Sequence, residues 1–85
     1  MTLSSTYNPP QEPLEILHHD AEILVVNKPE GLLSVPGRGE HLTDCLIARV
    51  QKVFPEALLV HRLDRDTSGV MVFGLSPHAQ RHLSM

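Results

Sequence analysis

The sequence predicts a small α+β domain, because short apolar strands and helical segments follow one another along 85 residues. Residues 23–27 and 70–73 have the apolar, partly β-branched character of buried strands. Between them, apolar side chains recur at helical spacing over residues 46–54. A chain of this length buries only about 60 to 65% of its unfolded surface, so we expect one domain of marginal stability.

The first elements along the chain are an arm and a hairpin. Residues 1–13 are polar and contain several prolines, and we expect them to form a flexible N-terminal arm. The structured domain then covers residues 14–85. Residues 14–17 and 23–27 predict two strands separated by a polar turn, His18-His19-Asp20. These strands are expected to pair as a hairpin.

Two helices follow from capping signals. Thr43 or Asp44 can cap a helix that Pro55 ends, and its apolar face would cover one side of the sheet. The apolar positions of that face are Leu46, Ile47, Val50, Val53 and Phe54. Ser76-Pro77 supplies an N-cap followed by proline at the first helical position, so a second helix is expected over residues 78–85.

The most informative residues connect the predicted strands 58–60 and 70–73. This connection is His61-Arg62-Leu63-Asp64-Arg65-Asp66-Thr67-Ser68-Gly69. An arginine close to Asp64 would favour the ionised carboxylate, which suits a nucleophile better than a general acid. Gly69 can take a positive φ without a Cβ clash, so the chain can turn and enter the next strand. We therefore predict that Asp64 is a reactive carboxylate on a loop with a rigid base.

This nonapeptide resembles the active-site signature of the RluA-type pseudouridine synthases, and Asp64 falls on the catalytic aspartate of that family. The segment Asn27-Lys28-Pro29-Glu30-Gly31 is similar to the Asn-Lys-Pro-x-Gly segment near the start of these enzymes. The resemblance implies that residues 14–85 are the N-terminal part of the family's catalytic domain. It also implies an incomplete portion of a largely antiparallel mixed sheet with flanking helices.

The implied reaction is the isomerisation of uridine to pseudouridine in structured RNA. The resemblance implies ribosomal RNA and tRNA as substrates and no cofactor, because the reaction has no net redox change. Asp64 could attack C6 of the base, attack C1′ of the ribose, or remove a ribose proton, and the sequence leaves these routes open. The target base must leave its stack to reach the carboxylate.

Four basic residues are candidates for RNA contact. Arg62 could hold a phosphate or stack in the space that the flipped base vacates. The other candidates are Arg65, Lys28 and Arg38, which could contact phosphates. The chain as a whole has seven Lys and Arg against ten Asp and Glu, a formal charge of −3. Because that sign opposes RNA binding, any contact has to come from a local basic patch or from residues that this sequence lacks.

The family also uses residues that this sequence does not match. In these enzymes, a tyrosine that packs on the target base and a basic residue that pairs with the aspartate come from later segments. Tyr7, the only tyrosine, lies in the arm and does not match that motif. We therefore expect the 85-residue chain to be inactive alone and to self-associate through unpartnered strand edges and apolar faces. The alternative is a non-catalytic RNA-binding or assembly module.

Two other sequence patterns resemble functional sites, one a protease motif and one a metal site. Asp66-Thr67-Ser68-Gly69 resembles the Asp-Thr-Gly of aspartic proteases, but Ser68 intervenes before the glycine, and a protease would have to pair two Asp66 residues by dimerising. His78 and His82 have the i, i+4 spacing of metal ligands, yet spacing places no third ligand, so no metal is expected. Cys45 or His41 could complete such a site only through an unknown fold.

Composition indicates the setting. Cys45 is the only cysteine, so no internal disulfide is possible and a buried thiol in a reducing, cytoplasmic environment is expected. No apolar run approaches the roughly 20 residues that span a bilayer, and we predict no membrane association.

Overall fold

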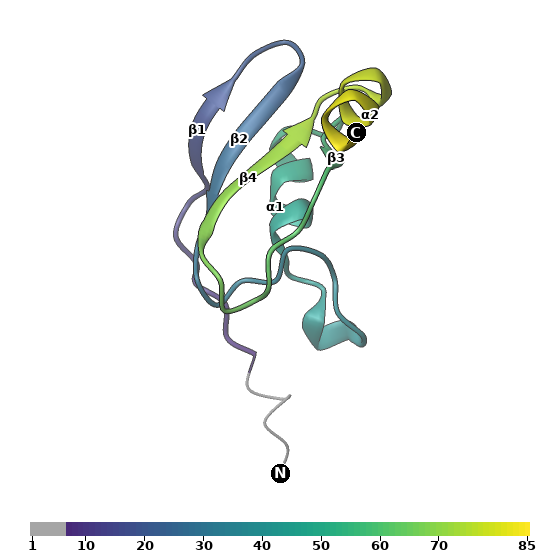
Figure 1. The fold of residues 1–85 in the computed structure, drawn as a ribbon. Coiled ribbons are helices and arrows are strands. Elements are labelled where there is room, and N and C mark those ends of the chain that lie inside the picture. The colour runs from purple at the N-terminus through teal and green to yellow at the C-terminus, as the bar shows by residue number, and fades with distance from the viewer. Residues whose placement is uncertain (1–6) are drawn as a thin grey trace.

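The computed structural model describes residues 7–85, which form an antiparallel sheet flanked by two helices (Figure 1). The strands are β1 (Glu15–His19), β2 (Ile23–Lys28), β3 (Leu58–Leu59) and β4 (Gly69–Gly74), in the spatial order β1-β2-β4-β3. The helices are α1 (Leu46–Val53) and α2 (Pro77–Ser84), with a 3-10 turn η2 (Glu40–Leu42). The predicted α+β class is confirmed, and every strand pair is antiparallel.

The predicted hairpin is confirmed, although its first strand is shifted along the chain. β1 runs to His19, so the two histidines assigned to the turn belong to the strand. Asp20 makes the turn, because its carboxylate accepts hydrogen bonds from the backbone N–H groups of Glu22 at 2.8 Å and Ile23 at 2.9 Å. The ring Nε2 of His18 lies 2.8 Å from the same carboxylate.

These contacts lower the pKa of Asp20 to about 2, and the bond from His18 is the largest cause. Because the ordinary value is 3.8, the stability contributed by this carboxylate is fully present above that pH and is lost as the pH falls through about 2. An NMR titration of the Asp20 carboxyl should therefore give a midpoint near 2. A midpoint at the ordinary value would contradict this account of the turn.

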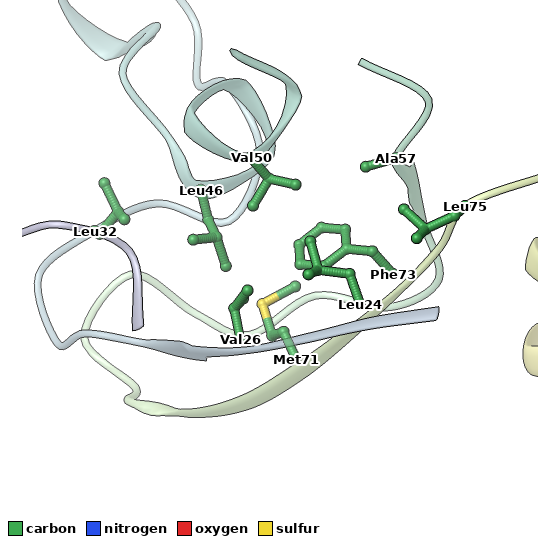
Figure 2. Close-up of a cluster of buried hydrophobic side chains, with 9 residues drawn as sticks. All are labelled: Leu24, Val26, Leu32, Leu46, Val50, Ala57, Met71, Phe73 and Leu75. Atoms are coloured by element: carbon green, nitrogen blue, oxygen red, sulfur yellow. The ribbon is translucent and has the colours of Figure 1, made fainter. Parts of the chain in front are cut away.

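The core lies between one face of the sheet and α1 (Figure 2). Alternate residues of a strand face the same side, so β2 and β4 each contribute every second side chain. The buried apolar side chains from these three elements are Leu24, Val26, Met71, Phe73, Leu46 and Val50. The expected helical face is confirmed at Leu46 and Val50, but Val53 is 60% exposed because it stands in the last turn, where α1 ends.

The predicted cap of α1 is wrong. The helix begins at Leu46, and Cys45 is its N-cap without a side-chain hydrogen bond. Neither Thr43 nor Asp44 caps it. The Asp44 carboxylate instead accepts two hydrogen bonds from the Arg49 guanidinium, at 2.8 and 2.7 Å, which lowers the pKa of Asp44. The thiol of Cys45 is free and buried, as expected.

Backbone carbonyls from a neighbouring segment do the capping. The Leu46 N–H donates to the Leu33 carbonyl at 2.7 Å, and the Ile47 N–H donates to the Ser34 carbonyl at 3.1 Å. These two bonds satisfy donors that the first turn of any helix leaves without an intrahelical partner. The segment after β2 is therefore attached to the start of α1.

Helix α2 begins as predicted. The Ser76 hydroxyl accepts a hydrogen bond from the Ala79 N–H at 3.0 Å, and Pro77 follows it. A Cβ on Gly74 would lie 2.7 Å from backbone atoms of Gln80, so the helix backbone packs directly on β4. Because Gly74 and Phe73 point to opposite faces, α2 covers one end of the face that α1 leaves open.

The predicted arm spans residues 1–13, of which residues 1–6 lie outside the described part. Its described half is attached at Tyr7. The Tyr7 hydroxyl donates to the Asp44 carbonyl at 2.7 Å and accepts from the Leu33 N–H at 3.0 Å. The helices within residues 7–85 are too short and too polar to traverse a bilayer.

Candidate active site

Asp64 lies on the loop between β3 and β4, and its side chain is exposed. The loop turns just after it, because the Thr67 N–H donates to the Asp64 carbonyl at 3.0 Å. Gly69 enters β4 with a φ of +152°, which confirms the expected positive value. Within residues 7–85, no hydrogen bond or ion pair involves the Asp64 carboxylate, so it is available to a ligand.

The rest of the loop is anchored at every second residue. His61, Leu63, Arg65 and Thr67 each have at least one backbone or ring atom bound to another segment. Arg62 and Asp64 lie between these anchors and are exposed. Arg62 and Asp64 are thus two exposed side chains, two residues apart, on a loop whose neighbouring residues are held.

Ser34 anchors the residue immediately before Asp64. Its hydroxyl donates to the Leu63 carbonyl at 2.6 Å and accepts from the Leu63 N–H at 3.0 Å. Leu63 itself packs partly against the core. The backbone on the N-terminal side of Asp64 is therefore held through both of its polar groups.

Lys28 anchors the residues after Asp64. Its ammonium donates to the carbonyls of Arg65 at 3.0 Å and Thr67 at 2.7 Å, and to that of Pro29 at 3.0 Å. The Gly31 N–H also donates to the Arg65 carbonyl, at 2.8 Å. Together these bonds attach the turn after Asp64 to the end of β2.

The position of Lys28 does not fit the phosphate contact expected from the sequence. The residue is fully buried, and its ammonium is occupied by three carbonyl groups. Burial lowers the pKa of Lys28, while the nearby carboxylates of Asp66, Asp64 and Glu30 oppose that effect. Lys28 is therefore a structural cation beneath the loop.

His61 holds the loop where strand pairing stops. β3 pairs with β4 only through Leu58 and Leu59, which leaves the Val72 N–H without a β3 carbonyl. The His61 ring Nε2 accepts from that N–H at 3.2 Å, so the ring takes the place of the missing strand partner. The roles of His61 and Ser34 were not predicted, although His61 begins the nonapeptide that carries the family resemblance and Ser34 lies three residues after Gly31.

The expected arginine partner of Asp64 is not formed. Arg65 pairs with Asp66 instead, at 3.3 Å, and no ion pair among the described residues joins Arg62 to Asp64. Arg38 is exposed on the turn before η2, and no hydrogen bond or ion pair within residues 7–85 joins it to the loop. The structure thus places Arg62, Arg65 and Asp64 on one loop, and Arg38 on a different turn.

Asp64 stands on open surface. Three hollows on the described residues have volumes of about 540, 280 and 230 Å³, and residues 61–68 line none of them. His78 and His82 stack with ring centres 6.1 Å apart, and residues 7–85 bring no three His, Cys, Asp or Glu side chains together as a metal site. The described residues therefore supply a positioned carboxylate that lies outside these three hollows.

Comparison with known proteins covers both the sequence and the fold. Residues 22–85 match a family described as RNA pseudouridylate synthase. The chain is 58% identical over 78 residues to the dual-specificity RNA pseudouridine synthase RluA of Escherichia coli K12. This match covers 91% of this chain and 36% of that protein. The relative of the same name in Vibrio vulnificus is 50% identical, over 91% of this chain and 31% of its own length.

A solved structure shows the same fold. Human RNA Pseudouridylate Synthase Domain Containing 4 is 30% identical with a TM-score of 0.64, and the match covers 81% of this chain and 27% of that chain. This chain thus spans about a third of the length of the curated relatives it matches. Because the family match includes both the β2 segment and the Asp64 loop, the chain belongs to the RNA pseudouridylate synthase family.

Proposed function

We propose that this chain is the Asp64-bearing part of a synthase that isomerises uridine to pseudouridine in ribosomal RNA and tRNA. The observation that carries the proposal is the state of Asp64, an exposed carboxylate with no bond to the described residues on a loop anchored on both sides. Such a group is free to react and is held in place while it does so. The proposed setting is the cytoplasm.

The isomerisation of uridine requires one positioned carboxylate. The bond between N1 and C1′ breaks, the base rotates, C5 joins C1′, and the hydrogen on C5 leaves as a proton. Asp64 would begin this sequence by one of the three routes open to a carboxylate, at C6, at C1′ or on a ribose proton. No cofactor is required, because no electrons are gained or lost overall.

Loss of the C5 hydrogen supplies the test. Stem-loop RNA with tritium at C5 of uridine is incubated with this chain, and with a chimaera in which it replaces the matching segment of the Escherichia coli relative. We expect the chimaera to release tritium. No release by the chimaera, under conditions in which the unaltered relative is active, would contradict the proposal. Release by the 85-residue chain alone would show that the expectation of inactivity is wrong.

Arg62 is the basic residue that we favour for RNA contact beside Asp64, since both side chains are exposed two residues apart on one loop, and no ion pair among the described residues involves Arg62. Arg62→Ala is expected to weaken stem-loop binding and to reduce the salt dependence of the affinity by about one phosphate contact. Filter binding at several salt concentrations measures both. Arg81→Ala, at an exposed arginine of α2, is the matched control. Equal affinity and salt slope in the two variants would exclude this role.

Arg65 and Arg38 remain proposals of lower rank for RNA contact. The guanidinium of Arg65 pairs with Asp66, and Arg38 lies on a different turn, where no hydrogen bond or ion pair within residues 7–85 joins it to the loop. Neither is assigned a role at the reacting base.

A non-catalytic RNA-binding module is the second candidate, and the exposure of Asp64 outside the three hollows favours it. This alternative predicts that the 85-residue chain binds stem-loop RNA in a salt-dependent way and that Asp64→Asn does not abolish the binding. It also predicts no tritium release by the chain or by the chimaera.

We also propose that the chain alone self-associates through apolar side chains such as Val70, which is 54% exposed, and Leu17, which is 49% exposed. A monodisperse monomer in light scattering would contradict that proposal.

A further inference from the structure

We propose that Ser34 is a positioning residue for Asp64, because it connects the Asp64 loop to helix α1. The inference rests on the proposed function for its catalytic part and on contacts within the chain for its structural part. Ser34 is 3% exposed and lies outside the loop that carries Asp64. It would act through Leu63, and it does not reach the reacting base itself.

The first step concerns the peptide bond between Leu63 and Asp64. The Ser34 hydroxyl has one proton, which is donated to the Leu63 carbonyl at 2.6 Å. A peptide unit is planar, so a carbonyl held at Leu63 also sets the direction of the Asp64 N–H. The hydroxyl oxygen accepts from the Leu63 N–H at 3.0 Å, which holds the preceding peptide unit as well. The two successive peptide units on either side of Leu63, which lead to Asp64, are thus both held by Ser34.

The second step concerns what holds Ser34. Its own carbonyl accepts the Ile47 N–H at 3.1 Å, and the adjacent Leu33 carbonyl accepts the Leu46 N–H at 2.7 Å. Both donors belong to the first turn of α1, whose buried side chains pack on the sheet. The Ser34 oxygen also lies 3.4 Å from the sulfur of Met71, a core residue of β4. These contacts hold Ser34 against α1 and the core, and its hydroxyl in turn restrains the backbone of the Asp64 loop.

Two substitutions of Ser34 distinguish a role in positioning Asp64 from a role in folding. Ser34→Ala removes the hydroxyl and leaves both polar groups of Leu63 without that partner, whereas Ser34→Thr keeps a hydroxyl. In the active chimaera we expect Ser34→Ala to lower kcat by about 10- to 100-fold with KM changed less than about twofold, because a small displacement of the reacting group costs rate more than binding. Ser34→Thr should restore most of kcat.

Ser84→Ala is the matched control. Its hydroxyl donates to the Gln80 carbonyl at 2.8 Å at the end of α2, on an exposed surface. It should leave kcat and KM unchanged. An unchanged kcat in Ser34→Ala, or a kcat in Ser34→Thr as low as in Ser34→Ala, would overturn the catalytic part of the proposal.

Amide hydrogen exchange in the 85-residue chain tests the structural part without any activity. In Ser34→Ala the Leu63 amide should exchange at least about tenfold faster, while amides of the β2–β4 ladder such as Val26 keep their protection. Unchanged exchange at Leu63 would overturn the proposal. Equal acceleration at Leu63 and Val26 would also overturn it, because Ser34 would then stabilise the whole domain and not the loop.

The two experiments fail in different ways. If the chimaera never releases tritium, the proposed function fails, and the exchange data still decide whether Ser34 holds the loop. If the chimaera is active and Leu63 exchanges faster in Ser34→Ala with kcat unaltered, the proposed function stands and the positioning role of Ser34 is refuted.

Discussion

Asp64→Asn is expected to lower tritium release by the chimaera at least about a thousandfold. Asparagine has nearly the same shape as aspartate but carries no negative charge, and it can neither attack carbon nor take up a proton as a carboxylate does. All three routes open to Asp64 need that charge. The loss is therefore expected whichever route the reaction follows.

The same substitution should leave the fold intact, because the Asp64 side chain is exposed and makes no hydrogen bond among the described residues. We expect the free energy of unfolding in urea to change by less than about 0.5 kcal/mol. Asp66→Asn, two residues along the same loop, is the matched control. That change removes an exposed pair with Arg65 and should leave release within about twofold. Equal loss in both variants would move the catalytic role away from Asp64.

Local signals predict the parts of this fold that short segments determine. The hairpin follows from two apolar runs around a polar turn, and the start of α2 follows from Ser76 and Pro77. The exposed loop position of Asp64 follows from the apolar strands on either side of it. In each case the residues that decide the structure lie close together in the sequence.

Contacts between distant segments could not be predicted in the same way. The start of α1 is capped by the carbonyls of Leu33 and Ser34. No local sequence pattern predicts a cap that is formed by backbone carbonyls of another segment. The predicted caps therefore failed, although the helix itself was predicted. Ser34 and Leu63 are 29 residues apart, so their hydrogen bonds depend on how the sheet and helix pack.

Charge near Asp64 illustrates the same limit. Neighbours in the sequence suggested an arginine beside the carboxylate, but in the folded loop Arg65 pairs with Asp66, and no ion pair among the described residues joins Arg62 to Asp64. The cation beneath the loop is Lys28, whose ammonium bonds to a carbonyl 37 residues away. From the sequence Lys28 was a candidate for phosphate contact, but in the structure it is fully buried beneath the loop.

Lys28→Met should destabilise the chain more than any other single change to the site. Methionine fills similar space without a donor, so the carbonyls of Thr67 and Pro29 lose the bond from Lys28, while Arg65 keeps the bond from the Gly31 N–H. A fully buried carbonyl without a partner costs about 1–3 kcal/mol, these two bonds are only part-buried, and the ammonium itself is costly to bury, so we expect a net loss of about 1–3 kcal/mol. Urea unfolding, followed by circular dichroism, measures it.

Lys52→Met is the control, because Lys52 is an exposed residue in the last turn of α1. It should change the free energy of unfolding by less than about 0.5 kcal/mol. The opposite result, a Lys28→Met chain as stable as the original or more so, would mean that the desolvation cost of the buried ammonium exceeds the gain from its three hydrogen bonds. In that case Lys28 would be retained for the placement of Asp64 and not for stability, and the variant should fold well yet release tritium slowly.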